Sequence, residues 1–338
     1  MKQITEIRSV SGNEHKIRNY IVKQVKKQIK DVKVDKYGNI VAHKKGPGAK
    51  VMLLAHMDEI GLMVKSIGES GNIYVSEIGG IEATAIIGET VKIQTKKGTI
   101  NGIVTFPEIH DGEDLEEVGG VESLIVVTGL TKKELKKKGV EVGSFVEFEK
   151  ETITLGKKEI ICGKALDDRI GCFILLELAK KLKKSKANIY FVFTVQEEIG
   201  LYGSKTSIHA IDPDWAIAID VTNADDSKEH THEITKAVGK GPCITVKDAD
   251  MISNVCIDDW IKTISKKKKI PIQLEVNNGG TTDALSISVA KGGIPTAVVG
   301  VAVKNLHTCI GIASMSDIKN AIKILTELLK NPPKVCLD

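Results

Sequence analysis

Short apolar runs alternate with amphipathic helical patterns over residues 1–65 and again after residue 158. Continuous apolar runs of this kind are typical of strands that are buried on both faces of a sheet. These runs occupy residues 51–55, 188–195, 215–220 and 293–303. Helical patterns with one apolar face cover residues 15–29, 169–184 and about 314–330. The rhythm predicts an α/β domain with helices on both faces of its sheet.

The stretch from residue 66 to residue 158 has a different pattern. Segments such as NIYVSEI, ETVKIQT and GSFVEFE alternate apolar and polar positions and are separated by Gly-rich turns. We predict a small β-barrel-like domain there, with an exposed acidic loop over residues 107–120. The α/β domain is then built from residues 1–65 and 159–338, and the β-rich insertion of 66–158 interrupts it.

Local signals define the start of the chain. Ser11 to Glu14 match a capping box and predict that a helix begins directly after them. The segment VKVDKYGNIVAHKKG has two alternating stretches around Gly38 and Asn39, which predicts a hairpin.

Composition and charge exclude several classes of protein. The 338 residues carry a net charge of +4, and the lysine clusters at 136–138 and 266–269 have no aromatic residues between them. Nucleic acid is therefore not an expected partner. No apolar region opens the chain and no run approaches 18 apolar residues, so we expect a cytoplasmic protein without a membrane partner. The six cysteines form no C-x-x-C pair, which argues against a zinc ribbon.

Candidate ligands stand where the apolar runs end. The carboxyl ends of strands in an open α/β sheet form the crevice in which ligands bind, so these side chains are expected to converge. They are His56, Asp58, Glu197, Glu198, Asp220 and His307. Asp167 and Asp168 add two carboxylates in a loop that precedes a helix.

This set of side chains is suited to a metal centre. Imidazole and carboxylate ligands without thiolate favour Zn²⁺, Co²⁺ or Mn²⁺ in a hydrolytic site. A pair of such ions needs one carboxylate to bridge them. His56 and Asp58 are two residues apart in an extended segment, so Asp58 is expected to orient the His56 ring. Each motif alone is common on protein surfaces, and only their joint occurrence points to a site.

Six strings strengthen this interpretation. In order and spacing they resemble the tetrahedral (TET) aminopeptidases, a family of dinuclear metallopeptidases that includes glutamyl aminopeptidases and proteins once labelled endoglucanases. The strings are LLAHMDEIGLMV, GKALDDRIG, TVQEEIGLYGS, AIDVTNADD, TTDALSIS and GGIPTAVVGVAVKNLHT. The resemblance spans nearly the whole chain. It implies a mixed-sheet, phosphorylase/hydrolase-like catalytic domain, and dimers that assemble into a tetrahedral dodecamer through the β insertion.

The resemblance also implies a role for each residue. His56 and Asp220 would bind one divalent ion, Glu198 and His307 the other, and Asp167 would bridge the two. Glu197 would be the general base, and Asp58 would orient His56. Asp168 would not be a ligand, and its peptide bond with Asp167 is expected to be cis.

The chain departs from the family pattern at three places. Asn223 stands where the family usually has histidine, and Gly311 where it usually has an acidic residue. Lys304 and Asn305 replace the Arg-Tyr pair that commonly precedes the last histidine. None of these is an expected ligand, so the departures bear on substrate preference and subunit contacts.

The hypothesis is an aminopeptidase with two Zn²⁺ or Co²⁺ ions. It hydrolyses N-terminal residues from short peptides by means of a hydroxide that bridges the two metals, with Glu197 as general base. The alternatives are another dinuclear amidase, such as a carboxypeptidase or deacylase, and a glycosidase. A glycosidase uses two separated carboxylates without a metal, which two histidines and adjacent Glu197 and Glu198 fit poorly. A binding protein with a degenerate site is the non-enzymatic alternative.

Overall fold

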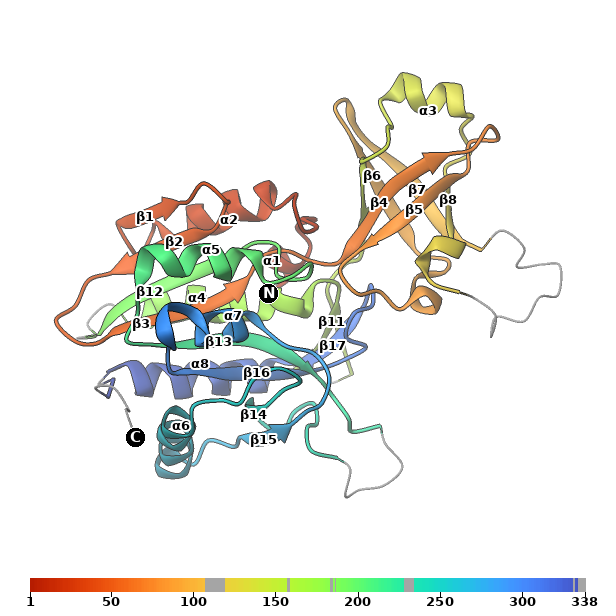
Figure 1. The fold of residues 1–338 in the computed structure, drawn as a ribbon. Helices are drawn as coiled ribbons and strands as arrows, with labels where there is room; N and C mark the ends of the chain where they lie inside the picture. Colours follow the sequence, from red (N-terminus) through yellow and green to blue (C-terminus); the bar gives the residue numbers. More distant parts are fainter. Residues whose placement is uncertain are drawn as a thin grey trace.

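The protein is described by a computed structural model. The described residues are 1–106, 119–156, 159–182, 185, 187–227, 234–330 and 332–333. Most of the acidic loop expected at 107–120 lies outside them. Two bodies are visible in Figure 1, a layered α/β domain and a barrel beside it.

An 11-stranded mixed sheet forms the centre of the larger body. Along its main path the strands are β1 (Asp31–Val34), β2 (Ile40–Lys44), β12 (Asn188–Thr194), β3 (Lys50–His56), β13 (Trp215–Asn223), β16 (Thr296–Lys304), β17 (Gly311–Ser314), β11 (Ile160–Gly163) and β10 (Ile153–Leu155). Off this path, β14 (Cys243–Lys247) pairs with β16, and β15 (Gln273–Val276) pairs with β14.

The four middle strands, β12, β3, β13 and β16, run parallel to one another. In β3 alternate side chains enter different clusters: Leu53 and Ala55 pack on one face of the sheet, and Met52 and Leu54 on the other. Because both faces are covered, the strand is apolar at almost every position. The parallel arrangement also brings the carboxyl ends of the four strands to the same edge of the sheet.

Helices cover both faces of the sheet (Figure 1). The helices that share the first cluster with Leu53 are α2 (His15–Val25), α4 (Leu166–Lys181), α6 (Val255–Lys268) and α8 (Met315–Lys330). The helices on the opposite face are α5 (Tyr202–Ile211) and α7 (Asp283–Ser288). In the part of the chain that the structure describes, the remaining helical elements are α1 (Lys2–Thr5), α3 (Lys132–Lys138) and the 3₁₀ turns η1 (Ala83–Ile86), η3 (Val121–Ser123) and η5 (Ala290–Gly292).

The smaller body is a closed barrel around a separate apolar cluster. Around the barrel the strands are β4 (Gly61–Ile67), β5 (Ile73–Ile78), β8 (Ile125–Val127), β7 (Gly98–Thr105), β6 (Thr90–Thr95) and β9 (Phe145–Phe148). All of its pairings are antiparallel, and α3 lies at the end far from the sheet (Figure 1).

The predicted fold class, a mixed α/β domain interrupted by a small β-barrel, is confirmed. The division of the chain after residues 65 and 158 stays a prediction. The expected capping box is wrong: α2 begins at His15, but its N-cap Glu14 makes no side-chain cap hydrogen bond. Ser11 instead donates to Asp58 (2.6 Å), and Glu14 accepts from the backbone of Gly12 and Gln196.

Over the described residues, none of the helices has the length and apolar character needed to cross a membrane.

Candidate metal centre

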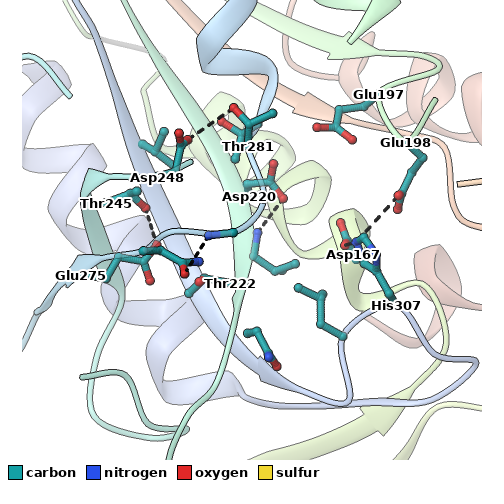
Figure 2. A pocket seen from close by; sticks show the side chains of 18 of the residues that line it. Asp167, Glu197, Glu198, Asp220, Thr222, Thr245, Asp248, Glu275, Thr281 and His307 are labelled. Carbon is teal, nitrogen blue, oxygen red and sulfur yellow. Dashed lines mark hydrogen bonds and ion pairs between the residues drawn. The ribbon is translucent and has the colours of Figure 1, made fainter. Parts of the chain in front are cut away.

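The candidate ligands gather at the carboxyl edge of the parallel strands. His56 is the last residue of β3, Asp220 lies in β13, and Glu197 and Glu198 follow β12. Asp167 opens α4, and His307 follows β16. Figure 2 shows Asp167, Glu197, Glu198 and His307 together at one side of a pocket, with Asp220 next to them.

A first group of three ligands consists of His56, Asp167 and Asp220, whose ligand atoms all lie within 4.8 Å of one another. His56 Nε2 is 2.9 Å from Asp167 Oδ1 and 3.9 Å from Asp220 Oδ1. We call this group the sheet-side donor set, because His56 and Asp220 both lie on strands of the central sheet.

A second group consists of Asp167, Glu198 and His307, again with ligand atoms within 4.8 Å of one another. His307 Nε2 is 3.7 Å from Asp167 Oδ2 and 3.9 Å from Glu198 Oε2. We call it the loop-side donor set, since Glu198 and His307 stand in loops after β12 and β16. Asp167 belongs to both sets and directs one carboxylate oxygen to each histidine.

Asp58 contacts residues of both donor sets from the buried side of the centre. It is fully buried, its backbone carbonyl oxygen lies 3.2 Å from His56 Nδ1, and its Oδ1 lies 3.5 Å from the same nitrogen. The backbone N–H groups of Glu197 and Glu198 donate to its two carboxylate oxygens at 3.1 and 3.2 Å. Asp58 therefore contacts both the His56 ring and the turn that carries the two glutamates.

Glu197 stands beside the donor sets without belonging to either. Its Oε2 is 4.0 Å from His56 Nε2, and the residue lines the same pocket. Burial, together with Asp220, Asp283 and Glu198 nearby, raises the pKa of Glu197 well above its ordinary value, although His56 opposes this effect. A carboxyl group with a raised pKa beside a cluster of candidate ligands is a candidate for proton transfer.

Negative charge accumulates in the centre. Burial raises the pKa of Asp220 from 3.8 to about 8 and the pKa of Glu198 well above 4.5, with Asp167 adding to both shifts. Desolvation alone would lower the pKa of His56, but Glu197, Asp167 and Asp58 raise it well above 6.5. Buried carboxylates this close together need positive charge among them, and divalent cations supply it. The donors therefore fit two divalent ions chemically.

Asp168 has a different environment from its neighbour. The Asp167–Asp168 peptide bond is cis, as the family resemblance implied. Asp168 is fully buried and accepts from the Gly171 backbone at 2.8 Å, so it points into the protein and belongs to neither donor set.

Sequence reasoning did not find several residues around the centre. Ser11 comes from the N-terminal segment to hold Asp58. Asp283 of α7 is buried and accepts hydrogen bonds from Thr194 at the end of β12 and from Ser204 of α5. Asp283 belongs to the string TTDALSIS and Ser11 to the predicted capping box, but neither pattern indicates a contact with the centre, because these partners lie far apart in the chain.

A cleft of about 690 Å³ contains both donor sets and continues beyond Asp220 toward β14 and β15. Asn223, one of the departures from the family pattern, lines it as well. Gly311 instead lies against Leu166, the first residue of α4 and the neighbour of Asp167.

A mixed α/β sheet with a barrel insertion, and two histidine and carboxylate donor sets at its carboxyl edge, defines a class of metal-dependent hydrolases. The family model of the M42 glutamyl aminopeptidases matches residues 38–324. The chain belongs to the M42 aminopeptidase family.

Individual relatives agree with this family over almost their entire length. A lysyl aminopeptidase of Pyrococcus furiosus is 36% identical over 98% of this chain and 96% of its own. The structure of an aminopeptidase from Desulfurococcus kamchatkensis is 32% identical, with a TM-score of 0.94 over 98% of this chain and 94% of that one. A TET1 peptidase of Pyrococcus horikoshii is 30% identical, with a TM-score of 0.87 over 97% of both chains.

Proposed function

We propose that this protein is a dinuclear aminopeptidase that removes N-terminal residues from short peptides. The observation that carries the proposal is the position of Asp167, whose two carboxylate oxygens face two different histidines and so join two donor sets. A single ion would not need this arrangement, whereas a pair of ions needs one bridging carboxylate.

The two donor sets would hold one Zn²⁺ or Co²⁺ ion each, with Asp167 shared between them. When bound, two such ions polarise the scissile carbonyl and lower the pKa of a water molecule to about 7. The α-amine of the peptide is expected to bind at the same centre, which restricts cleavage to the first residue.

Glu197 is the proposed general base. It lies next to His56 but is not needed as a ligand, so its carboxylate is free to take a proton from the attacking water. The same carboxyl group then delivers this proton to the leaving amine. Asp58 contributes by holding the His56 ring and the backbone of Glu197.

Glu197→Gln tests the proton-transfer role. The amide keeps the shape of the side chain but cannot accept the proton, so we expect kcat to fall by roughly 10²–10⁴-fold. Metal analysis is expected to find two equivalents per chain in both proteins. Glu151→Gln, at a side chain with 81% exposure, is the matched control and should keep full activity. A Glu197→Gln enzyme with most of its activity would contradict the assignment.

Substrate panels separate the competing hydrolases. Amino-terminal and carboxy-terminal chromogenic peptides, N-acyl amino acids and cellulose oligomers are offered to the metal-loaded enzyme before and after chelation. Cleavage only of substrates with a free α-amine, lost with chelator and restored by Zn²⁺ or Co²⁺, is the expected result. Chelator-resistant cleavage of a glycoside would favour the glycosidase alternative.

We also propose that the protein is a homo-oligomer, with a tetrahedral dodecamer as the specific form. The support comes from the TET1 peptidase of Pyrococcus horikoshii, which can assemble into a tetrahedron or a large octahedral shell. The barrel is the expected assembly element because it stands apart from the domain that carries the site (Figure 1).

A further inference from the structure

The cleft has a second polar region away from the two donor sets. Beyond Asp220 it is lined by residues of β14, β15 and the segments that follow them. Figure 2 shows Thr245, Asp248 and Glu275 on the side of the pocket opposite Glu198 and His307. We call this region the distal end of the cleft.

Glu275 is the side chain at the distal end with an unused hydrogen-bonding atom. The residue is 3% exposed and belongs to β15. Its Oε1 accepts a hydrogen bond from Thr245 Oγ1 at 2.8 Å, whereas its Oε2 has no hydrogen-bond partner among the described residues. A buried carboxylate oxygen without a donor is costly to fold. A donor supplied by a ligand would offset that cost.

Asp248 adds a second buried carboxylate to the same wall. Its Oδ1 accepts from the backbone of Asp250 and Met251, which holds the side chain in place. Its Oδ2 has only a long contact of 3.5 Å with Thr281 Oγ1. The outer oxygen of Asp248 is therefore available on the pocket side, where the residue forms part of the lining.

The charge at the distal end is negative. Outside the donor sets and Glu197, the charged residues that line the described part of the cleft are Glu82, Asp225, Lys236, Asp248 and Glu275. Lys236 lies 3.9 Å from Glu275 Oε2, so its charge is already matched by that carboxylate. Among the described residues, the three carboxylates of Asp225, Asp248 and Glu275 outnumber this one lysine, so the distal end attracts a cationic side chain and repels an anionic one.

The sheet register sets the distance between the two regions. Ala218 of β13 pairs with Val298, Val298 pairs with Thr245, and Thr245 pairs with Glu275. Asp220 is two residues after Ala218 on the same face of β13. Three strand spacings separate the β13 and β15 backbones, roughly 14 Å. Asp220 and Glu275 stand on the same face of the sheet and both line the cleft, so a long side chain held near Asp220 would extend toward Glu275.

We propose that the distal end binds the cationic side chain of the N-terminal residue, with Glu275 and Asp248 as its acceptors. The substrates would then be peptides that begin with lysine or arginine. The inference rests on the proposed aminopeptidase function, because it takes the α-amine to be held near Asp220. Lysine and arginine carry their donors on long flexible stems, and both can supply the hydrogen bond that Glu275 Oε2 lacks.

The first test needs no variant. Lysyl, arginyl, norleucyl, leucyl and glutamyl p-nitroanilides are compared on the Zn²⁺- or Co²⁺-loaded full-length enzyme. Norleucine matches the lysine stem without the ammonium group, so the lysyl to norleucyl ratio of kcat/KM isolates the charge. We expect this ratio to be about tenfold or more, with glutamyl substrates cleaved most slowly. A ratio near one, or a preference for glutamyl substrates, would overturn the inference.

Glu275→Gln then tests the residue itself. The variant is expected to lower the lysyl to norleucyl ratio about tenfold, while Glu151→Gln leaves the ratio unchanged. Thr245→Val, which removes the donor to Glu275 Oε1, should lower the ratio less. If Glu275→Gln folds poorly, Thr245→Val and the panel on the unaltered enzyme still decide the question.

Calorimetry gives a reading that does not depend on turnover. L-lysine is expected to bind the metal-loaded protein about tenfold more tightly than L-norleucine, and Glu275→Gln should remove the difference. Equal binding of the two amino acids would contradict the inference. Failure of the parent proposal looks different, since no substrate in the panel would then be cleaved at all.

Discussion

Asp220 shows how burial controls the pKa of a single carboxyl group in the centre. It is 7% exposed, and burial raises its pKa to about 8. In the unfolded chain the same group has a pKa near 3.8. Between these values the folded protein holds a proton that the unfolded chain has released. Without metal, the free energy of unfolding therefore falls as pH rises through this window.

Asp220→Asn tests this pH dependence. We expect the melting temperature of the metal-free parent protein to decrease as pH rises from about 5 to about 8, because Asp220 must ionise in a buried site. The Asn variant lacks the titrating group, so its melting temperature should decrease less over the same range. Thermal melts of both proteins after chelation are the measurement. Equal decreases would mean that Asp220 does not titrate there.

Single residues differ in how much of their role the sequence reveals. His56, Asp220 and Glu198 stand at the ends of apolar runs. Because the carboxyl ends of parallel strands form one crevice, the sequence predicts that these residues lie together. Their roles in binding metal stay predictions. The local pattern around Ser11 predicts a capping box, whereas in the structure Ser11 donates a hydrogen bond to Asp58. A serine three residues before a glutamate has the same local pattern whether it caps a helix or bonds to a distant side chain. Only the tertiary contact distinguishes these two roles.

Glu275 illustrates the opposite limit. In the sequence it is one charged residue in a short alternating segment, QLEV, on a strand at the edge of the sheet. Its importance comes from three strand pairings that place it across the cleft from Asp220. Such pairings are not encoded in local spacing, because β13, β14, β15 and β16 are separated by helices and loops.

At the scale of elements, the hairpin of β4 and β5 connects the barrel to the loop-side donor set. The turn after β5 contains Gly79 and Gly80. A Cβ on Gly79 would lie 3.2 Å from Glu198, and one on Gly80 would lie 3.0 Å from His307 Nδ1. The Glu82 backbone also donates to the His307 carbonyl at 3.4 Å. The barrel backbone thus packs directly against two proposed ligands.

Gly80→Ala tests this contact. The added methyl group would push against the His307 ring, so we expect metal affinity to fall by about 10–100-fold. Gly68→Ala is the matched control, since Gly68 lies in the turn of the same hairpin, where a Cβ would meet its nearest atom at 3.4 Å. Titration of the metal-free proteins with Zn²⁺ measures both. Unchanged affinity in Gly80→Ala would show that His307 moves aside freely.

Regular elements were the part of the structure most accessible to sequence reasoning. The four apolar runs became β3, β12, β13 and β16, because each strand is covered on both faces and shows it in its composition. The alternating segments after β3 became a barrel. The sequence predicted a barrel-like domain but not which strands pair to close it. The barrel closes through the pairing of β9 with both β4 and β6, which depends on contacts between distant segments.

At the scale of the whole molecule, the proposed assembly predicts a mass. We expect multi-angle light scattering to give about twelve times the 36.6 kDa of one chain, because a tetrahedron of dimers contains twelve copies. A matched measurement on the metal-free protein shows whether the ions are needed for assembly. A monomer at micromolar concentration in both states would contradict the proposed oligomer.

The unequal support of the two donor sets has a consequence for the whole chain. His56 and Asp220 are parts of the central sheet, the most deeply covered layer of the molecule. Glu198 and His307 instead stand at the joint where the barrel rests on that layer. A rotation of the barrel relative to the α/β domain would therefore displace Glu198 and His307 before His56 and Asp220. The proposed ion of the loop-side donor set would respond to it first. We therefore expect the affinity for the loop-side ion to depend on the relative orientation of the barrel and the α/β domain, and the affinity for the sheet-side ion to be independent of it.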